Sequence, residues 1–193
     1  MRITGGTACG RRLNAPRGEA VRPSQDRLRE SLFSMLAPRL PDARVLDLFA
    51  GSGALGLEAW SRGAAEVWWV ERDPRVGRIL RANVASICGP EAHGVRCLVG
   101  DARHPARWTE GGPFTIVLAD PPYALSREAA FVRALLRELA SAAMLAEGGC
   151  VVIEQAGDAP AVRVAGWRVE RDRVLGGSRL VRYGRAPAEE TEP

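Results

Sequence analysis

One loop of the chain carries three glycines at the spacing of a nucleotide-binding motif. Residues 46–56 read LDLFAGSGALG, so Gly51, Gly53 and Gly56 form a G-x-G-x-x-G pattern, and Glu71 lies 20 residues after Gly51. This pattern is typical of dinucleotide-binding folds, in which the loop backbone approaches a pyrophosphate. Asp47, however, stands directly before the loop, where its negative charge would repel a pyrophosphate. The sequence therefore favours a different ligand.

Four acids lie at or near the carboxyl ends of four successive predicted strands, and they indicate what that ligand is. They are Asp47, Glu71, Asp101 and Asp120. In a doubly wound sheet the ligand binds beyond the carboxyl ends of the strands, so these acids should surround one crevice. An acidic crevice suits a ligand with a cationic amino group, ribose hydroxyls and an adenine amine. S-adenosylmethionine has all three, and a positively charged sulfur besides.

The expected contacts follow from the chemistry of each residue. Gly51 and Gly53 let the backbone approach the ligand without a clash from a Cβ atom. Asp47 can favour the methionine ammonium group, directly or through water. Glu71 can accept hydrogen bonds from both ribose hydroxyls, and Asp101 can accept one from the adenine amine.

The motif DPPY, residues 120–123, indicates the reaction. Two consecutive prolines remove two backbone donors and stiffen the turn, which leaves acceptor groups beside an aromatic ring. The Asp120 carboxylate and the Pro121 carbonyl can accept from both N–H bonds of a nucleobase amine, while Tyr123 stacks on the base. Positioning and electrostatics of this kind can direct the nitrogen lone pair at a methyl group.

Alternating apolar strands and amphipathic helices position these residues. Continuous apolar strands between helices predict a parallel sheet that is covered on both faces. The end of the chain has no helix between its last two strands, so it predicts an antiparallel hairpin at the sheet edge. The fold class is α/β, a doubly wound, mostly parallel, seven-stranded Rossmann-like sheet with an antiparallel C-terminal hairpin and an N-terminal β-hairpin and helix. The predicted strands are 44–49, 66–71, 95–100, 114–119, 150–155, 167–175 and 178–185; the predicted helices are 24–36, capped by Ser24, 54–62, 74–87, capped by Asp73, and 126–144, with Gly148 and Gly149 ending the segment that follows.

Positive charge is concentrated at the start of the chain. Residues 1–40 hold eight arginines and three acids, a net charge of +5, whereas residues 41–193 hold 19 arginines and 20 acids. Arginine donates bidentate hydrogen bonds that suit phosphate, and the chain contains no lysine. An unbalanced basic segment predicts a polyanionic partner.

Length and composition limit the remaining possibilities. A chain of 193 residues is expected to form one main domain, here residues 41–185, with a basic arm at 1–40 packed on it and a disordered tail at 186–193. No apolar run is long enough to cross a membrane, and the N-terminus does not resemble a secretory signal, so we expect a cytoplasmic protein. No long apolar stripe is left spare for a partner copy, so we expect a monomer. The four cysteines and two histidines show no ligand spacing, so we expect reduced thiols and no metal.

Taken together, the motifs resemble a known family. The segments ITGGTACGRRLNAP, RPSQDRLRESLFSML, LDLFAGSGALGLEAWSRGA, VERD, GDA and DPPY are similar to bacterial 16S rRNA guanine-N2 methyltransferases of the RsmD type, a family of class I S-adenosylmethionine-dependent methyltransferases. The similarity runs from residue 2 to about residue 184. The resemblance implies transfer of a methyl group to the 2-amino group of a guanine in 16S rRNA, either free or in the assembling small ribosomal subunit.

The resemblance also implies three sets of site residues. The catalytic set is Asp120, Pro121, Pro122 and Tyr123; the cofactor set is Asp47, Phe49, Ala50, Gly51, Ser52, Gly53, Glu71, Arg72, Asp101, Ala102 and Asp120; the RNA-binding set is Arg2, Arg11, Arg12, Arg22, Arg27 and Arg29.

Other functions are compatible with parts of the pattern. Adenine-N6 methyltransferases of DNA or RNA use the same four-residue motif, although little chain is left here for a separate DNA-recognition domain. Protein glutamine methylation poses the same chemical problem at an amide nitrogen. The glycine pattern alone also fits a nicotinamide-dependent oxidoreductase, against which Asp47 and the DPPY motif argue. A non-enzymatic RNA-binding module would leave the acids and DPPY without a role.

Overall fold

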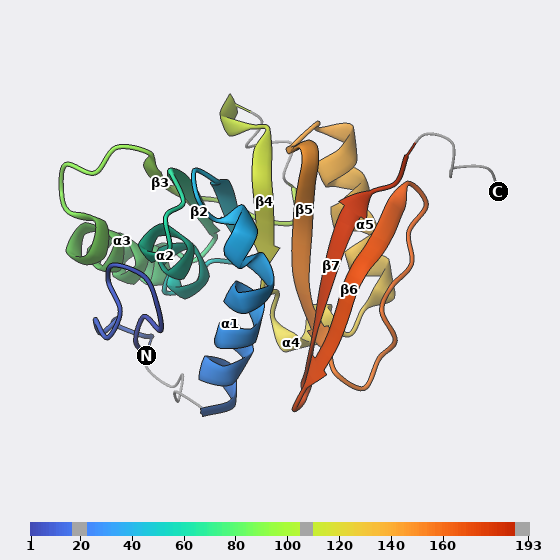
Figure 1. The fold of residues 1–193 in the computed structure, drawn as a ribbon, viewed down its shortest axis with the longest axis horizontal. Helices are drawn as coiled ribbons and strands as arrows, with labels where there is room; N and C mark the ends of the chain where they lie inside the picture. The colour runs from blue at the N-terminus through green and yellow to red at the C-terminus, as the bar shows by residue number, and fades with distance from the viewer. Residues whose placement is uncertain (17–22, 105–109, 188–193) are drawn as a thin grey trace. The chain divides into compact units, whose positions relative to one another are not determined.

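The structure of the protein is a computed structural model that describes residues 1–16, 23–104 and 110–187. The chain divides into two compact units, Met1–Ala102 and Arg103–Pro193 (Figure 1). No helix in the described part of the chain is long and apolar enough to cross a membrane.

The first unit contains a parallel sheet in the strand order β3-β2-β1. Its strands agree with the predicted ones to within one residue at each end. Asp73 caps a helix as predicted, because its Oδ1 accepts a hydrogen bond of 2.7 Å from the Arg75 N–H. The elements are α1 (Pro23–Leu36), η1 (Ala37–Arg39), β1 (Arg44–Leu48), α2 (Ala54–Ser61), β2 (Glu66–Glu71), α3 (Pro74–Cys88) and β3 (Val95–Val99).

The N-terminal hairpin packs on α2 within this unit. Arg2 and Arg12 form an antiparallel bridge, and the Ile3 N–H donates to the Arg11 carbonyl at 3.0 Å. The Thr4 N–H and hydroxyl both donate to the Glu58 carboxylate, at 2.8 and 2.7 Å. Glu58 is completely buried and also pairs with the Arg62 guanidinium, which lies one helical turn further along α2. The predicted hairpin is therefore confirmed, and it is anchored through a buried charge.

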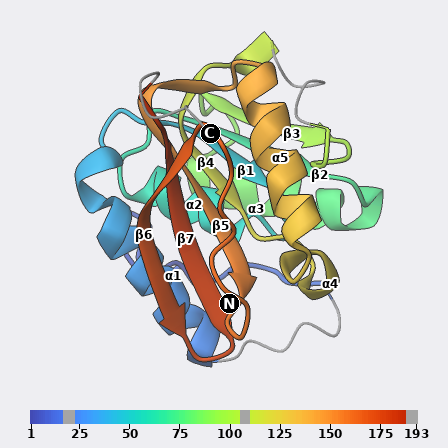
Figure 2. The same cartoon turned by 90° about the vertical axis from the view of Figure 1, so that its right-hand side faces the viewer.

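The second unit contains the remaining four strands in the order β4-β5-β7-β6. β4 and β5 are parallel, whereas β7 is antiparallel to both β5 and β6 (Figure 2). The predicted C-terminal hairpin is confirmed, and β6 is the edge strand of this unit. The elements are β4 (Phe114–Ala119), α4 (Tyr123–Ser126), α5 (Ala129–Ser141), β5 (Leu145–Ala156), β6 (Trp167–Leu175) and β7 (Ser178–Arg185).

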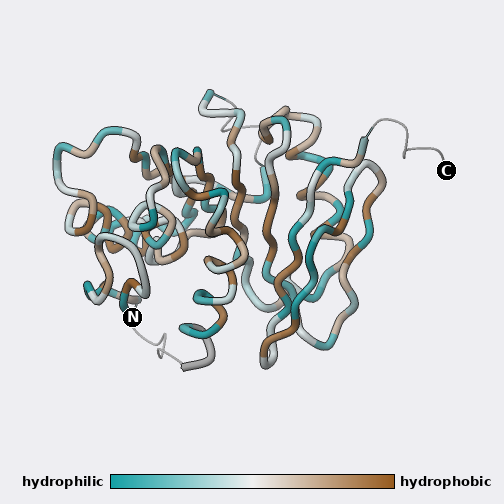
Figure 3. Tube along the Cα trace, in the orientation of Figure 1, coloured by the Kyte–Doolittle hydropathy of each residue, from teal (hydrophilic) through white to brown (hydrophobic). Residues whose placement is uncertain are grey.

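Hydrophobic residues are concentrated in the inner strands of this unit. β4 and β5 are hydrophobic over much of their length, whereas β6 is largely hydrophilic (Figure 3). Val117, Val151, Ile153 and Val181 are completely buried. The contrast follows from burial, because β4 and most of β5 have both faces covered while β6 exposes most of its side chains to water.

Three predicted element boundaries are wrong. The predicted helix at residues 126–144 is divided into α4 and α5, and α5 ends early because Ala143 is left-handed, with φ 50°, and the Met144 N–H bonds back to the Leu139 carbonyl. Gly148 and Gly149 lie inside β5, where an irregularity interrupts its pairing with β4, rather than ending an element. α1 begins at Pro23, so Ser24 lies within the helix and not at its cap.

Candidate active site

The glycine loop, residues 49–53, connects β1 to α2 in the first unit. Its backbone is left-handed at Phe49, Gly51 and Gly53, with φ of 61°, 55° and 86°. Backbone hydrogen bonds help to hold it: the Ala50 N–H donates to the Val70 carbonyl at 3.0 Å, and the Gly53 N–H donates to the Ala50 carbonyl at 2.7 Å. The loop is thus tied to the neighbouring strand β2 and tightly folded on itself.

The three glycines of the motif have different surroundings. A Cβ atom on Gly51 would meet no atom within 4 Å, so this position borders open space. A Cβ on Gly53 would lie 2.4 Å from Leu80 Cδ1, and one on Gly56 would lie 2.2 Å from Trp69 Nε1. Gly53 and Gly56 are therefore required for packing inside the unit, whereas Gly51 is the glycine at which a ligand can approach the backbone.

Asp47 lies within β1 and is only 1% exposed. Its Oδ2 accepts a hydrogen bond of 2.8 Å from the Gly56 N–H, one of the α2 amides that have no partner inside the helix. Burial raises the pKa of Asp47 to about 8, the nearby Glu71 carboxylate also raises it, and the Gly56 hydrogen bond opposes both effects. Asp47 therefore holds the start of α2 in place, and a contact with a ligand ammonium group stays a prediction.

Glu71 is the last residue of β2 and contacts the glycine loop directly. Its Oε2 accepts from the Gly51 N–H at 2.9 Å, and its Oε1 accepts from the Asp73 N–H at 2.8 Å. Each carboxylate oxygen has a second lone pair, so both can still accept from hydroxyl groups. Three further predicted cofactor residues come after β2 and β3. Arg72 is exposed, Asp101 is half-buried and Ala102 is buried.

Asn83 lies on α3 and supports the glycine loop, a role that the sequence did not predict. Its Nδ2 donates to the carbonyls of Ser52 and Asn14, both at 2.9 Å, and its Oδ1 accepts from the Asn14 N–H at 2.9 Å. The side chain, 2% exposed, therefore joins the glycine loop to the end of the N-terminal hairpin. The sequence does contain one signal for this role, because Asn83 is a polar residue on the apolar face of the helix, three positions after Leu80.

Two of the predicted RNA-binding arginines are engaged inside the first unit. Arg29 is 5% exposed, pairs with Asp26 at 2.5 Å and donates to the Arg2 carbonyl at 3.1 Å. Arg11 donates to the last carbonyls of α3, to Ile87 at 3.3 Å and also to Ser86. Both side chains therefore stabilise the fold. Arg29 is also buried, so it is not included in the proposed RNA-binding surface.

The other predicted RNA-binding arginines have different environments. Arg2, Arg12 and Arg27 are exposed, as is the engaged Arg11. Arg22 lies outside the described residues. The exposed arginines are therefore the ones available to a partner from this segment.

The proline turn, residues 120–123, follows β4 in the second unit. Pro121 is buried, whereas Asp120 and Pro122 are exposed and Tyr123 is 66% exposed. The Pro122 carbonyl accepts from the N–H groups of Leu125 and Ser126, at 2.8 and 3.0 Å, and so begins the short helix α4. The turn thus presents a carboxylate and an aromatic ring to solvent from a rigid backbone.

Glu154 on β5 lies beside Asp120, and the sequence interpretation missed it. Ala119 pairs with Ile153 in the parallel register, so the next residues along the two strands are Asp120 and Glu154. Their carboxyl groups are hydrogen bonded, and Ser178 Oγ donates to Glu154 Oε1 at 2.6 Å. Two carboxyl groups can form this bond only when one is protonated. Burial raises the pKa of Glu154, and the hydrogen bonds with Ser178 and Asp120 oppose this effect. The two carboxyl groups therefore share one proton.

Tyr123 is held by a neighbouring arginine. Arg127 Nη1 donates to the Tyr123 hydroxyl at 2.5 Å, and the guanidinium lies 5.4 Å from the ring centroid. Arg127 also pairs with Asp158 at 2.7 Å. This chain of contacts restrains an aromatic side chain that would otherwise rotate freely in solvent.

A family model described as "Conserved hypothetical protein 95" matches residues 1–184. The chain belongs to this family. The curated relatives include "Ribosomal RNA small subunit methyltransferase D" of Escherichia coli, which is 38% identical over 91% of this chain and 85% of its own length. "Putative rRNA methyltransferase YlbH" of Bacillus subtilis is 37% identical over 80% of this chain and 82% of its own. The resemblance to RsmD-type methyltransferases is thus confirmed.

Solved structures of similar proteins confirm the fold class of this family member. "Putative methyltransferase yhhF from Escherichia coli" has a TM-score of 0.78 and 33% identity, covering 96% of this chain and 97% of its own. A hypothetical protein of Thermus thermophilus has a TM-score of 0.75 and 35% identity over 94% and 98% of the two chains. The predicted doubly wound, mostly parallel, seven-stranded Rossmann-like fold is the methyltransferase fold of these relatives.

Proposed function

We propose that this protein transfers a methyl group from S-adenosylmethionine to the N2 amine of a guanine in 16S rRNA. The observation that carries the proposal is the proline turn, in which an exposed Asp120 is hydrogen bonded to Glu154 beside an exposed Tyr123. The relatives named as rRNA methyltransferases, in Escherichia coli and Bacillus subtilis, support rRNA as the substrate. The resemblance of the sequence motifs to guanine-N2 methyltransferases supports the identity of the amine.

The first unit contains residues that fit the methyl donor. Gly51 borders open space, and the Glu71 carboxylate beside it can accept from ribose hydroxyls. Asp47 is buried beside the loop, and a cationic amino group bound there would favour its ionised form. Asp101 can accept from the adenine amine. Phe49, Ala50, Ser52, Gly53, Arg72 and Ala102 complete the proposed cofactor set. When bound, S-adenosylmethionine supplies a methyl group on positively charged sulfur.

The proline turn performs the chemistry on the acceptor. A guanine must leave its stack to reach such a turn, at a cost of roughly a few kcal/mol. The Asp120 carboxylate and the Pro121 carbonyl accept from the two N–H bonds of the amine, Pro122 keeps the turn rigid, and Tyr123 stacks on the base. Transfer would break the bond between the methyl carbon and the donor sulfur as the nitrogen forms its own bond to that carbon. The nitrogen would then carry the positive charge, and Asp120 would accept the proton that it loses.

Glu154 acts in this scheme as a positioning residue for Asp120. In this scheme the Glu154 carboxyl group holds the shared proton and donates to Asp120, while the Ser178 hydroxyl donates to Glu154 Oε1 at 2.6 Å. This arrangement orients Asp120 as an acceptor for the amine.

The test is methylation of small ribosomal subunits and of free 16S rRNA with cofactor labelled in the methyl group, followed by nucleoside analysis. We expect labelled N2-methylguanosine with the wild-type protein and loss of most of it with Asp120→Ala. Tyr123→Phe should retain activity because it keeps the ring, whereas Tyr123→Ala should not. Labelled N6-methyladenosine, labelled glutamine in protein, or no transfer from S-adenosylmethionine would overturn the proposal.

A further inference from the structure

A second basic segment lies in the C-terminal hairpin and the loop that precedes it. Residues 163–185 contain seven arginines and two acids, a net charge of +5. This equals the net charge of residues 1–40, although the hairpin segment is only 23 residues long. The arginines are Arg163, Arg168, Arg171, Arg173, Arg179, Arg182 and Arg185.

The two acids of this segment pair with arginines that lie near them. Asp172 pairs with Arg179 at 2.6 Å. Glu170 pairs with Arg182 at 3.0 Å and with Arg168 at 3.3 Å. Because each acid can offset only one positive charge, the surface of the hairpin remains strongly basic.

A β-bulge brings three of the arginines onto one face of β6. The register with β7 shifts between Val169 and Arg171, so Glu170 is an extra residue in β6. Arg168 pairs with Gly184, Arg171 with Arg182 and Arg173 with Leu180, and the β7 partners alternate by two residues. Paired residues share a face of the sheet, so Arg168, Arg171 and Arg173 lie on the same face. Without the bulge, Arg168 and Arg171 would lie on opposite faces.

These three side chains, called the arginine row here, are accessible. Arg171 and Arg173 are exposed, and the Arg168 side chain is 52% exposed. β6 is the edge strand of the second unit, so no further strand of that unit pairs with its outer side within the described residues. The β7 partners of the row run from Gly184 to Leu180, four residue steps. At about 3.3 Å per step the row extends over roughly 13 Å, which is long enough to lie beside more than one phosphate of a nucleic acid strand.

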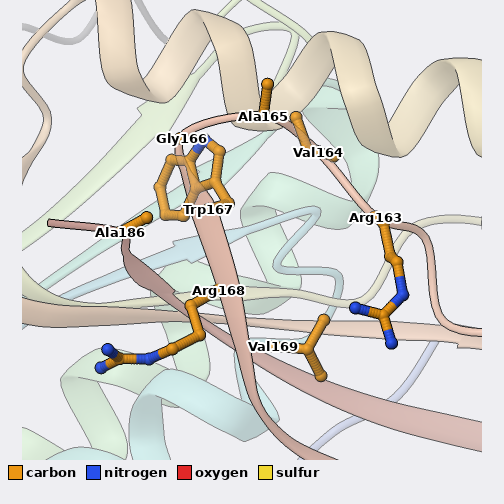
Figure 4. A pocket seen from close by; sticks show the side chains of 8 residues that line it. All are labelled: Arg163, Val164, Ala165, Gly166, Trp167, Arg168, Val169 and Ala186. Carbon is orange, nitrogen blue, oxygen red and sulfur yellow. The ribbon is translucent and has the colours of Figure 1, made fainter. Parts of the chain in front are cut away.

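The hollow at the start of β6 is not a site for a single anion. It measures about 280 Å³ and includes Arg163, Gly166, Trp167, Arg168 and Ala186 in its lining. Figure 4 shows the guanidinium groups of Arg163 and Arg168 on opposite sides of β6, so they do not converge on one point. The arginines are arranged to contact charges that are spaced along a chain.

We propose that the arginine row is a docking surface for the phosphate backbone of the RNA substrate. The proposal rests on the proposed function for the identity of the partner. Arginine offers bidentate hydrogen bonds to phosphate oxygens, and a row of separated guanidinium groups matches a chain of separated phosphates. The other explanation for charges on an edge strand is protection against pairing with a second molecule. That explanation predicts no effect of the arginines on RNA affinity.

The test compares two double variants that each remove two positive charges from the second unit. R171Q/R173Q changes the arginine row, and R133Q/R137Q changes two exposed arginines on α5. Binding to a 16S rRNA fragment is measured at several salt concentrations by fluorescence anisotropy. We expect R171Q/R173Q to reduce the slope of log affinity against log salt by about 1.5, and R133Q/R137Q to leave it unchanged. R171K/R173K keeps the charges and should restore the slope, whether or not R171Q/R173Q folds as well as the wild type.

Two results would overturn the inference while leaving the proposed function intact. One is an unchanged salt slope in R171Q/R173Q when the wild-type protein methylates guanosine. The other is self-association of R171Q/R173Q in gel filtration with an unchanged slope, which would assign the arginines to edge protection. A wild-type protein that produces no N2-methylguanosine would instead remove the proposed function itself.

Discussion

The glycine loop and the proline turn each follow a parallel strand, yet their aspartates are placed in opposite ways. Asp47, before the glycine loop, is 1% exposed and bonded to a backbone amide of α2. Asp120, at the start of the proline turn, is exposed and bonded to a second carboxyl group. The same residue type therefore supports a backbone in one unit and is presented to solvent in the other.

The difference shows how each segment keeps its shape. The glycine loop has a flexible backbone, so it needs hydrogen bonds from Asp47, Glu71 and Asn83 to hold one conformation. The proline turn is stiffened covalently by Pro121 and Pro122, so its carboxylate is not required for its own structure. Side chains that hold a segment and side chains that are presented by it should respond differently to substitution.

The largest expected effect is on the pH dependence of stability through Asp47. Its pKa is about 8 in the folded protein, against an ordinary value of 3.8, so the folded state holds a proton that the unfolded state releases. The contribution of Asp47 to the free energy of unfolding is therefore fully present below about pH 4. Between about pH 4 and pH 8 this contribution falls by about 1.4 kcal/mol per pH unit. The free energy of unfolding, measured with denaturant from about pH 5 to pH 7, should fall by about 3 kcal/mol more in the wild type than in Asp47→Asn. Equal slopes would mean that Asp47 is ionised when folded, and the contrast with Asp120 would disappear.

Asp120 should show the reverse pattern, with a large effect on turnover and a small one on stability. One charged hydrogen bond contributes roughly 1.5–3 kcal/mol, so Asp120→Ala should lower kcat about 10- to 100-fold. Cofactor affinity and the unfolding midpoint should change little, because the prolines maintain the turn. Glu138→Gln, at an exposed position of α5, is the matched control. Near-normal turnover of Asp120→Ala would remove this residue from the mechanism.

Glu154 should sharpen the contrast through the pH profile of kcat. Its pKa is raised by burial, so it is protonated at low pH and loses its proton as the pH rises. Two ionised carboxylates then repel each other, and kcat of the wild type should decline on the alkaline side. Glu154→Gln still donates to Asp120 and should remove that decline. Glu154→Ala should have a kcat about 10-fold below that of the wild type at low pH, without the alkaline decline. A profile that is identical in the wild type and Glu154→Gln would contradict the positioning role.

Asn83 tests the supporting network of the glycine loop. Asn83→Ala removes three hydrogen bonds and leaves the buried carbonyl of Ser52 without this donor, which should cost about 1–3 kcal/mol of unfolding free energy. Calorimetry should also show weaker cofactor binding, while kcat at saturating cofactor stays close to that of the wild type. Asn83→Asp keeps the acceptor for Asn14 and should be less impaired in stability. A kcat defect that saturating cofactor does not restore would place Asn83 in the chemistry instead.

The smallest expected effects distinguish two adjacent arginines. Arg11 donates to carbonyls at the end of α3, where a cation contributes roughly 0.3–1 kcal/mol, so Arg11→Gln should lower stability by about that amount. Arg12 is exposed, and Arg12→Gln should leave stability unchanged and reduce the salt slope of RNA binding by about 1. An unchanged slope in Arg12→Gln would argue against an RNA contact by the N-terminal hairpin.

The features that were predictable from the sequence are those with local causes. Apolar strands, the Asp73 cap and the DPPY turn depend on residues that are adjacent in the chain. The long helix predicted at residues 126–144 was wrong because its end depends on one left-handed alanine, Ala143, which no residue type signals. Gly148 and Gly149 were misjudged for a related reason, because a bulge inside a strand and a turn after it use the same residues.

The features that were missed depend on contacts between distant residues. Asn83 and Glu154 each meet partners from other elements, and neither belongs to a motif. The second basic segment was hidden by averaging, because acids elsewhere in residues 41–193 cancel its charge. The arginines of the arginine row share one face of β6 because of the bulge at Glu170. This bulge depends on the pairing of β6 with β7.

The buried Glu58 makes the N-terminal hairpin inseparable from the first unit. Its carboxylate accepts from Thr4 and pairs with Arg62, and Ser61 beside it bonds to the Gly5 carbonyl at 2.6 Å and accepts from the Ala8 N–H at 2.8 Å. Deleting the hairpin would uncover this charge at the helix that follows the glycine loop. A shortened protein that begins after the hairpin should thus be a poor starting point for crystallisation or ligand screening, and an affinity tag is better attached to the C-terminal end.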